Sequence, residues 1–122
     1  MPEILLIDDD AVQLQTREAV LRDAGFTVCS AGNAARALAM LRTPRLNHIL
    51  RLIITDHVMP GASGVSFVRK LRRFSPDVPV IVMTGSVEAK DEYAGLNVIF
   101  LSKPCPPEEL IQRARAAVSS RS

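Results

Sequence analysis

Five short apolar runs, each followed by a segment suited to a helix, constrain the fold of this 122-residue chain most strongly. A short apolar run bounded by turn residues is typical of a strand buried on both faces of a sheet. Strands that alternate with helices predict an α/β fold, with a parallel sheet covered by helices on both faces. The expected strands are Ile4–Ile7, Phe26–Ser30, Leu50–Thr55, Pro79–Met83 and Asn97–Leu101.

Capping residues, glycines and prolines set the limits of the intervening helices. Asn33 can cap a helix start, and Gly25 and Pro44 are suited to end one. Prolines and acidic residues favour the first turn of a helix, which suits the segment after Pro106. The expected helices are Ala11–Ala24, the segment from Asn33 to Arg42, Gly64–Phe74, a short one at Ser86–Ala94, and a last one that begins at Pro106 or Pro107 and buries Leu110, Ile111, Ala114 and Val118.

Composition narrows the class of protein. With 48% hydrophobic and 23% charged residues, we expect residues 1–122 to form a single domain with one core. A net charge of +2 predicts no partner by itself, and the basic run Arg69–Arg73 is interpreted as a solvated helix face. Cys29 and Cys105 lack a metal-ligand spacing, and no apolar run approaches the ~20 residues of a membrane span. We therefore expect a cytoplasmic protein that binds neither membranes nor nucleic acid directly.

Polar side chains follow four of the five expected strands. Because the carboxyl ends of parallel strands meet at one edge of a sheet, these side chains should converge. Clustered carboxylates repel one another unless a cation is present, and oxygen ligands suit magnesium. A lysine and a hydroxyl can hold phosphoryl oxygens, and an aspartate can attack phosphorus to give an acyl phosphate. The residues are Asp8, Asp9 and Asp10 after the first strand, Asp56 after the third, Thr84 after the fourth and Lys103 after the fifth.

Asp56 taken alone could be an ordinary polar residue that closes a strand before the turn signal Pro60-Gly61. The surrounding stretches change that interpretation, because together they resemble the receiver domain of two-component response regulators. The matching stretches are Ile-Leu-Leu-Ile-Asp-Asp-Asp at 4–10, Thr-Asp-His-Val-Met-Pro-Gly-Ala-Ser-Gly at 55–64, Val-Ile-Val-Met-Thr-Gly at 80–85, and Lys103-Pro104.

The resemblance implies a doubly wound, flavodoxin-like fold with five parallel strands in the order 2-1-3-4-5. It also implies that a histidine kinase or histidine phosphotransfer protein donates a phosphoryl group to Asp56 in a magnesium-dependent reaction. The domain would then change conformation and signal to a downstream effector that the sequence does not identify. Such a receiver is not an enzyme, apart from catalysing its own phosphorylation and dephosphorylation.

The same resemblance implies a role for each matching residue. Asp56 is the expected phosphoacceptor. The expected ligands of Mg²⁺ (or Mn²⁺) are Asp8, Asp9, Asp56 and the backbone carbonyl of Val58, with Asp8 acting largely through water. The phosphoryl group is expected to bind Thr84, Gly85 and Lys103, while Thr84 and Phe100 act as the switch, and Lys103-Pro104 is expected to be a cis peptide.

The chain departs from the receiver pattern in three places. Cys105 stands where phenylalanine is usual, and Val58 is apolar where many relatives carry a polar side chain. The 84–103 interval is short, which predicts a short fourth helix whose sizeable apolar side chains are Val87 and Tyr93. We expect Gly85–Gly95 to be the most mobile non-terminal segment, and the short helix to weaken dimerisation through the face that contains Phe100.

Two other functions remain compatible with these residues. Asp8-Asp9-Asp10-Ala11-Val12 satisfies the nucleophile motif of haloacid-dehalogenase-type phosphohydrolases, although no acid pair ends a strand after Lys103. A receiver fold that no longer takes phosphate is the other alternative. Asp10 is either a helix cap or an electrostatic part of the site, and His57 is interpreted as incidental.

Overall fold

Five parallel strands form one sheet in the order β2-β1-β3-β4-β5. The computed structural model describes residues 3–59, 63–86 and 88–120. This order and parallel pairing confirm the predicted doubly wound topology. The strands are β1 (Ile4–Ile7), β2 (Val28–Ala31), β3 (Leu52–Asp56), β4 (Val80–Thr84) and β5 (Ile99–Ser102).

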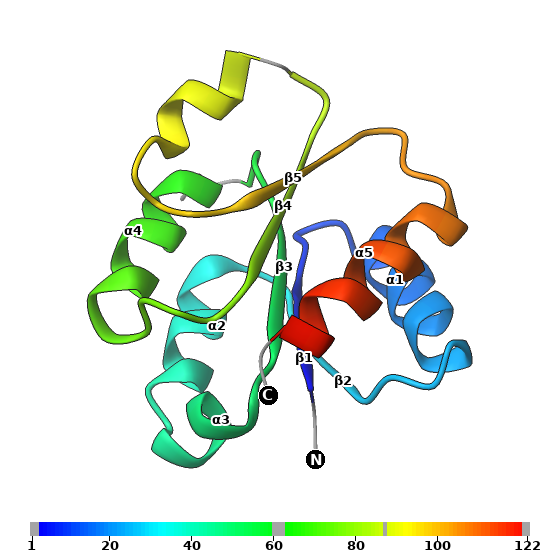
Figure 1. Ribbon diagram of the computed structural model, residues 1–122, viewed down its shortest axis with the longest axis horizontal. Coiled ribbons are helices and arrows are strands. Elements are labelled where there is room, and N and C mark those ends of the chain that lie inside the picture. The colour runs from blue at the N-terminus through cyan, green and yellow to red at the C-terminus, as the bar shows by residue number, and fades with distance from the viewer. Residues whose placement is uncertain (1–2, 60–62, 87, 121–122) are drawn as a thin grey trace.

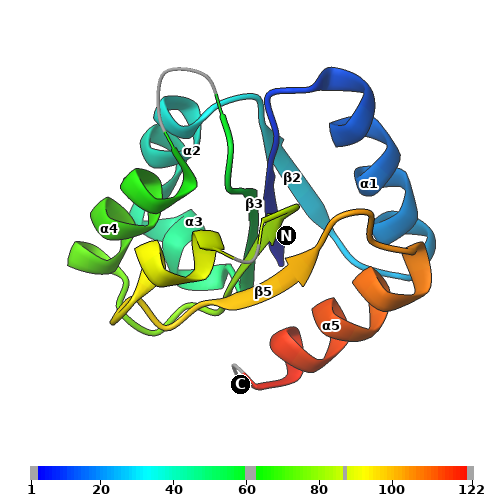
Figure 2. The same ribbon diagram turned by 90° about the horizontal axis from the view of Figure 1, so that it is seen from above.

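Helices cover both faces of the sheet. In Figure 2, α1 and α5 lie on one side, and α2, α3 and α4 lie on the other. A short 3-10 helix, η1, precedes β5 and is drawn in yellow in Figure 1. Among the helices of the described residues, none has the length and apolarity that crossing a membrane requires. The helices are α1 (Ala11–Asp23), α2 (Ala34–Leu41), α3 (Pro44–Ile49), α4 (Gly64–Phe74), η1 (Glu88–Tyr93) and α5 (Pro107–Ser120).

The core consists of two apolar layers separated by the sheet. Successive strand residues point to opposite faces, so Leu5 and Ile7 contribute to the layer under α2 and α4. Ile4 and Leu6 contribute to the layer under α1 and α5. All four are fully buried, and each buried side chain of this size stabilises the fold by about 1.5–3 kcal/mol. The continuous apolar run in β1 is thus explained by burial on both sides.

Several sequence-based expectations require correction. Pro44 begins α3 instead of only ending α2, which stops at Leu41, because proline is well tolerated in a first helical turn. Ile111 is only half-buried, and Ala117 takes its expected place in the core. The predicted turn at Pro60-Gly61 and the side chain of Val87 lie outside the described residues.

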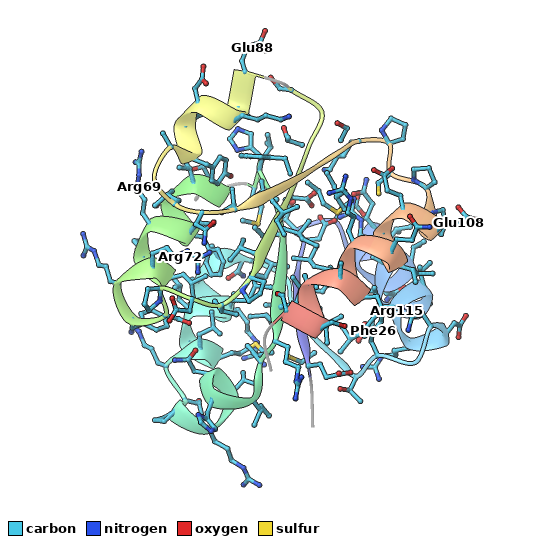
Figure 3. The ribbon with its side chains drawn as sticks, in the orientation of Figure 1. Phe26, Arg69, Arg72, Glu88, Glu108 and Arg115 are labelled. Atoms are coloured by element: carbon cyan, nitrogen blue, oxygen red, sulfur yellow. The ribbon has the colours of Figure 1, made fainter. Side chains whose placement is uncertain are left out.

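The sequence predicted that the basic run on α4 is a solvated helix face. The structure contradicts this prediction for Arg72. Arg69 is exposed, but Arg72 donates hydrogen bonds to the carbonyl oxygens of Leu96 at 2.8 Å, Ser75 at 3.1 Å, Val78 at 2.7 Å and Asn97 at 2.9 Å. Figure 3 shows Arg69 projecting from the helix, whereas Arg72 lies against the loops. Arg72 therefore connects the end of α4 to the segment between η1 and β5.

Candidate functional site

The site begins where the strand order reverses. The chain places β2 on one side of β1 and β3 on the other, and ligands of such sheets bind in the crevice at this switch point. Ile7 is in register with Thr55, so Asp8 directly follows β1 beside Asp56, the last residue of β3. The register of the two central strands therefore positions both carboxylates at the same edge.

Three carboxylates meet in this crevice. One oxygen from each of Asp8, Asp9 and Asp56 lies within 4.8 Å of the others. Asp8 and Asp56 are 1% and 2% exposed, whereas Asp9 is open to solvent. A set of ligands made of oxygen alone, with one side open to water, fits Mg²⁺ or Mn²⁺ better than softer metals. The structure thus brings together the three carboxylates that the sequence predicted as metal ligands.

Two basic side chains contact these acids. Lys103 Nζ lies 2.6 Å from Asp56 Oδ1, at the end of β5 where the sequence placed it. Arg17 was not predicted to belong to the site, yet its Nη1 lies 2.6 Å from Asp8 Oδ2 and 3.4 Å from Asp56 Oδ1. Arg17 follows the partly buried Leu14 by three positions and precedes the buried Leu21 by four, which places it on the inward face of α1. A charged residue among the apolar positions of this helix face was the sequence signal that could have revealed Arg17.

Burial changes the proton affinity of the acids. Removal of Asp8 from water raises its pKa to about 6, and a side-chain hydrogen bond with Asp56 and the charge of Asp56 act in the same direction. The Asp10 N–H, which donates to Asp8 Oδ1 at 2.9 Å, and the Arg17 guanidinium both lower the Asp8 pKa. Desolvation outweighs these two contacts, so the metal-free Asp8 carboxyl takes up a proton more readily than an exposed aspartate does.

Asp10 serves as a helix cap. Its Oδ1 accepts hydrogen bonds from the N–H groups of Val12 at 3.0 Å and Gln13 at 3.2 Å. This geometry is that of an N-cap residue, which satisfies amides that have no partner within the helix. Of the two roles considered for Asp10, the structure therefore shows the cap.

Residues from β4 and β5 complete the edge. Thr84 Oγ1 accepts a hydrogen bond from the Ser86 N–H at 3.0 Å, and the Lys103 N–H donates to the Thr84 carbonyl at 2.9 Å. The Lys103-Pro104 peptide is cis, as predicted. Gly85, which follows Thr84, is exposed. The threonine hydroxyl is thus engaged within its own loop, one residue from an accessible backbone amide.

A hydrogen bond and a ring contact connect His57, the residue after Asp56, to Phe100. His57 Nδ1 lies 2.9 Å from the Tyr93 hydroxyl, and the Tyr93 ring packs edge-on against Phe100, with centroids 5.4 Å apart. Tyr93 is 3% exposed, and its burial raises its pKa above the usual value for tyrosine. His57 thus has a structural contact that the sequence did not reveal, since it connects the residue after Asp56 to Phe100 through Tyr93.

Gly64 permits this arrangement. A Cβ atom at Gly64 would lie 2.5 Å from the Asp56 carbonyl oxygen and 2.6 Å from the Tyr93 hydroxyl. Contacts this short require the backbone or the ring to move. The absence of a side chain at the first residue of α4 therefore allows α4, η1 and the end of β3 to approach closely.

Comparisons with known proteins agree on one family. The family model of the response regulator receiver domain matches residues 4–115. The transcriptional regulatory protein AruR of Pseudomonas aeruginosa is 34% identical over 94% of this chain and 48% of its own length. The hydrogenase transcriptional regulatory protein HoxA of Bradyrhizobium diazoefficiens is also 34% identical, over 94% of this chain and 24% of its own. The chain thus spans half or less of the length of these relatives.

Solved structures show the same similarity. The chemotaxis response regulator CheY4 of Vibrio cholerae has a TM-score of 0.84 and 30% identity, covering 96% of this chain and 98% of its own. The receiver domain of the Francisella response regulator 1452 has a TM-score of 0.87 and 26% identity, covering all of both chains.

Proposed function

Because this chain belongs to the response regulator receiver domain family, we propose that Asp56 is the residue that accepts a phosphoryl group in a reaction requiring a divalent cation. The observation that supports this most strongly is the position of Asp56 itself. Its carboxylate lies between Lys103, 2.6 Å away, and the acidic pair Asp8 and Asp9 at the switch point. The receiver is a signalling domain and not an enzyme of the ordinary kind.

The proposed step is a direct transfer. A carboxylate oxygen of Asp56 attacks the phosphorus of a phosphohistidine, the P–N bond breaks, and the imidazole leaves with its electron pair. The product is an acyl phosphate, in which a new bond joins the Asp56 oxygen to phosphorus. The domain would catalyse this transfer, and the later hydrolysis, only on itself.

The surrounding residues would stabilise the charge of the transferred group. Lys103 is placed to leave Asp56 Oδ1 for a phosphoryl oxygen, and the Thr84 hydroxyl and Gly85 N–H would donate to the others. Asp9, Asp56, the Val58 carbonyl and, through water, Asp8 would hold Mg²⁺ or Mn²⁺. When bound, the cation neutralises charge on the phosphoryl oxygens.

The switch would use the contacts that already link the site to β5. If the Thr84 hydroxyl turns from Ser86 to a phosphoryl oxygen, the loop after β4 must rearrange. Phe100 packs on Tyr93, which lies in η1 directly after that loop. We therefore expect Phe100 to change its packing on phosphorylation, with η1 as the mobile part of the output face.

The donor is proposed to be a histidine kinase or a histidine phosphotransfer protein, and the reaction is proposed to occur in the cytoplasm. Two exposed apolar side chains favour a protein donor. Val12, in the first turn of α1, is 72% exposed, and Val58, just after β3, is 75% exposed. Burial of these side chains against a protein partner would remove them from water, which favours binding.

A labelling experiment tests the proposed function. The protein is incubated with acetyl phosphate and MgCl₂, and the intact mass is followed over time. We expect one phosphoryl group per chain, no label when a chelator replaces MgCl₂, and no label in Asp56→Asn. Metal-independent labelling, or full labelling of Asp56→Asn, would contradict the proposal.

A further inference from the structure

Arg17 introduces a permanent positive charge among the carboxylates. Its side chain is 14% exposed. Its Nη1 lies 2.6 Å from Asp8 Oδ2 and 3.4 and 3.5 Å from the two oxygens of Asp56. Arginine keeps its charge at any pH at which proteins are folded. The guanidinium therefore contacts two of the three carboxylates that fit a divalent cation.

We propose that Arg17 is an internal counter-ion that competes with the divalent cation for Asp8 and Asp56, and thereby sets how tightly the site binds Mg²⁺. This inference rests on the proposed function of the site, because it takes the same acids as metal ligands. In the metal-free protein, Arg17 offsets the repulsion between Asp8 and Asp56. When Mg²⁺ enters, the two cations would share a small, half-buried space and repel each other.

The structure offers the guanidinium another position. Arg17 lines a cavity of about 500 Å³ together with Gln13, Thr16, Val20 and Lys103. Its Nη2 already donates to Gln13 Oε1 at 3.1 Å. The side chain can therefore rotate about its stem towards Gln13 without moving α1. Moving the Arg17 side chain away from Asp8 and Asp56 costs free energy, and this cost weakens the net binding of the metal.

Calorimetric titration with MgCl₂ tests this competition. We compare the wild type with Arg17→Met, which keeps an unbranched stem but removes the charge. The control is Arg45→Met on α3, since Arg45 is exposed and α3 leads into the opposite end of β3 from Asp56. We expect Arg17→Met to lower the Kd for Mg²⁺ by at least about tenfold, equal to about 1.4 kcal/mol. Arg45→Met should match the wild type.

Thermal unfolding provides a second measurement. With a chelator present, Arg17→Met should melt below the wild type, because Asp8 and Asp56 lose their counter-ion. Saturating MgCl₂ should raise its melting temperature more than that of the wild type. If Arg17→Met does not fold, Arg17→Gln serves instead. Glutamine removes the charge but keeps a polar head, so its Kd for Mg²⁺ should also fall below that of the wild type.

An equal or higher Kd in both Arg17 variants would overturn the competition. This outcome is distinguishable from failure of the proposed function. If acetyl phosphate still labels Asp56 while the Kd is unchanged, only the role of Arg17 is wrong. If Asp56 is never labelled but the Kd falls in Arg17→Met, the role of Arg17 stands and the phosphoacceptor assignment fails.

Discussion

Asp8 should make the stability of the metal-free protein depend on pH. Its pKa is raised from 3.8 to about 6 in the folded state, because it is only 1% exposed and lies beside Asp56. Between about pH 4 and 6 the folded state therefore holds a proton that the unfolded chain lacks. By linkage, the free energy of unfolding falls as the pH rises through this window, and the loss is complete above about pH 7.

The size of this effect follows from the shift in pKa. A difference of about two pH units corresponds to about 3 kcal/mol, at about 1.36 kcal/mol per unit. The contribution of Asp8 is therefore about 3 kcal/mol at most. Acidification from about pH 7 to 5 should recover about 1.3 kcal/mol of it.

Urea unfolding in a chelating buffer at these two pH values measures the effect. The wild type is compared with Asp8→Asn, which keeps the side-chain oxygen that accepts from the Asp10 N–H but cannot ionise. His48 and His57 are present in both proteins, so their contributions cancel in the difference. Acidification should stabilise the wild type more than Asp8→Asn by about 1 kcal/mol. Saturating MgCl₂ should reverse the trend in the wild type, since protons then displace the metal.

An identical pH response in the two proteins would refute this reasoning. It would mean that Asp8 is ionised in the folded state over the whole range. The contacts with Arg17 and the Asp10 N–H would then outweigh desolvation.

Three further predictions concern packing and the donor. Arg72→Met should lower the free energy of unfolding by about 3 kcal/mol, because four carbonyl oxygens lose a charged donor. Arg69→Met on the same helix should change it by less than about 0.5 kcal/mol, and equal urea midpoints for the two variants would contradict this. Gly64→Ala should cost about 1–3 kcal/mol through overpacking against Asp56 and Tyr93 and should slow labelling by acetyl phosphate, and a wild-type rate would show that the close approach is unimportant. Val12→Ser should slow phosphoryl transfer from a phosphohistidine protein without changing labelling by acetyl phosphate, and an equal slowing with both donors would place Val12 in the chemistry instead of the contact surface.

The strands and the main acids of the site could be predicted from the sequence for a physical reason. Strands buried on both faces are mostly apolar, so β1, β3 and β4 are visible as apolar runs, and polar residues enter β3 and β4 only at their carboxyl ends. The acids come at that end of the strands, where the site lies. Asp8 and Asp56 mark those ends, and the parallel topology then brings them together.

The residues that the sequence did not reveal depend on contacts across the fold. Arg17 interrupts the apolar stripe of α1, and only the position of α1 above the switch point turns that interruption into an ion pair. His57 and Tyr93 are 36 positions apart, and no local pattern connects them. Arg72 resembles its solvated neighbours in sequence, but the loops that it contacts are formed by other parts of the chain.

The site of phosphorylation tests the central claim most directly. Protein treated with acetyl phosphate and MgCl₂ is reduced with borohydride, which converts a phosphoaspartate to homoserine, and the modified residue is located by peptide mass spectrometry. The account predicts modification at Asp56 and none at Asp8. Modification at Asp8, persisting in Asp56→Ala, would contradict it and would favour the phosphohydrolase chemistry that the motif after β1 also permits.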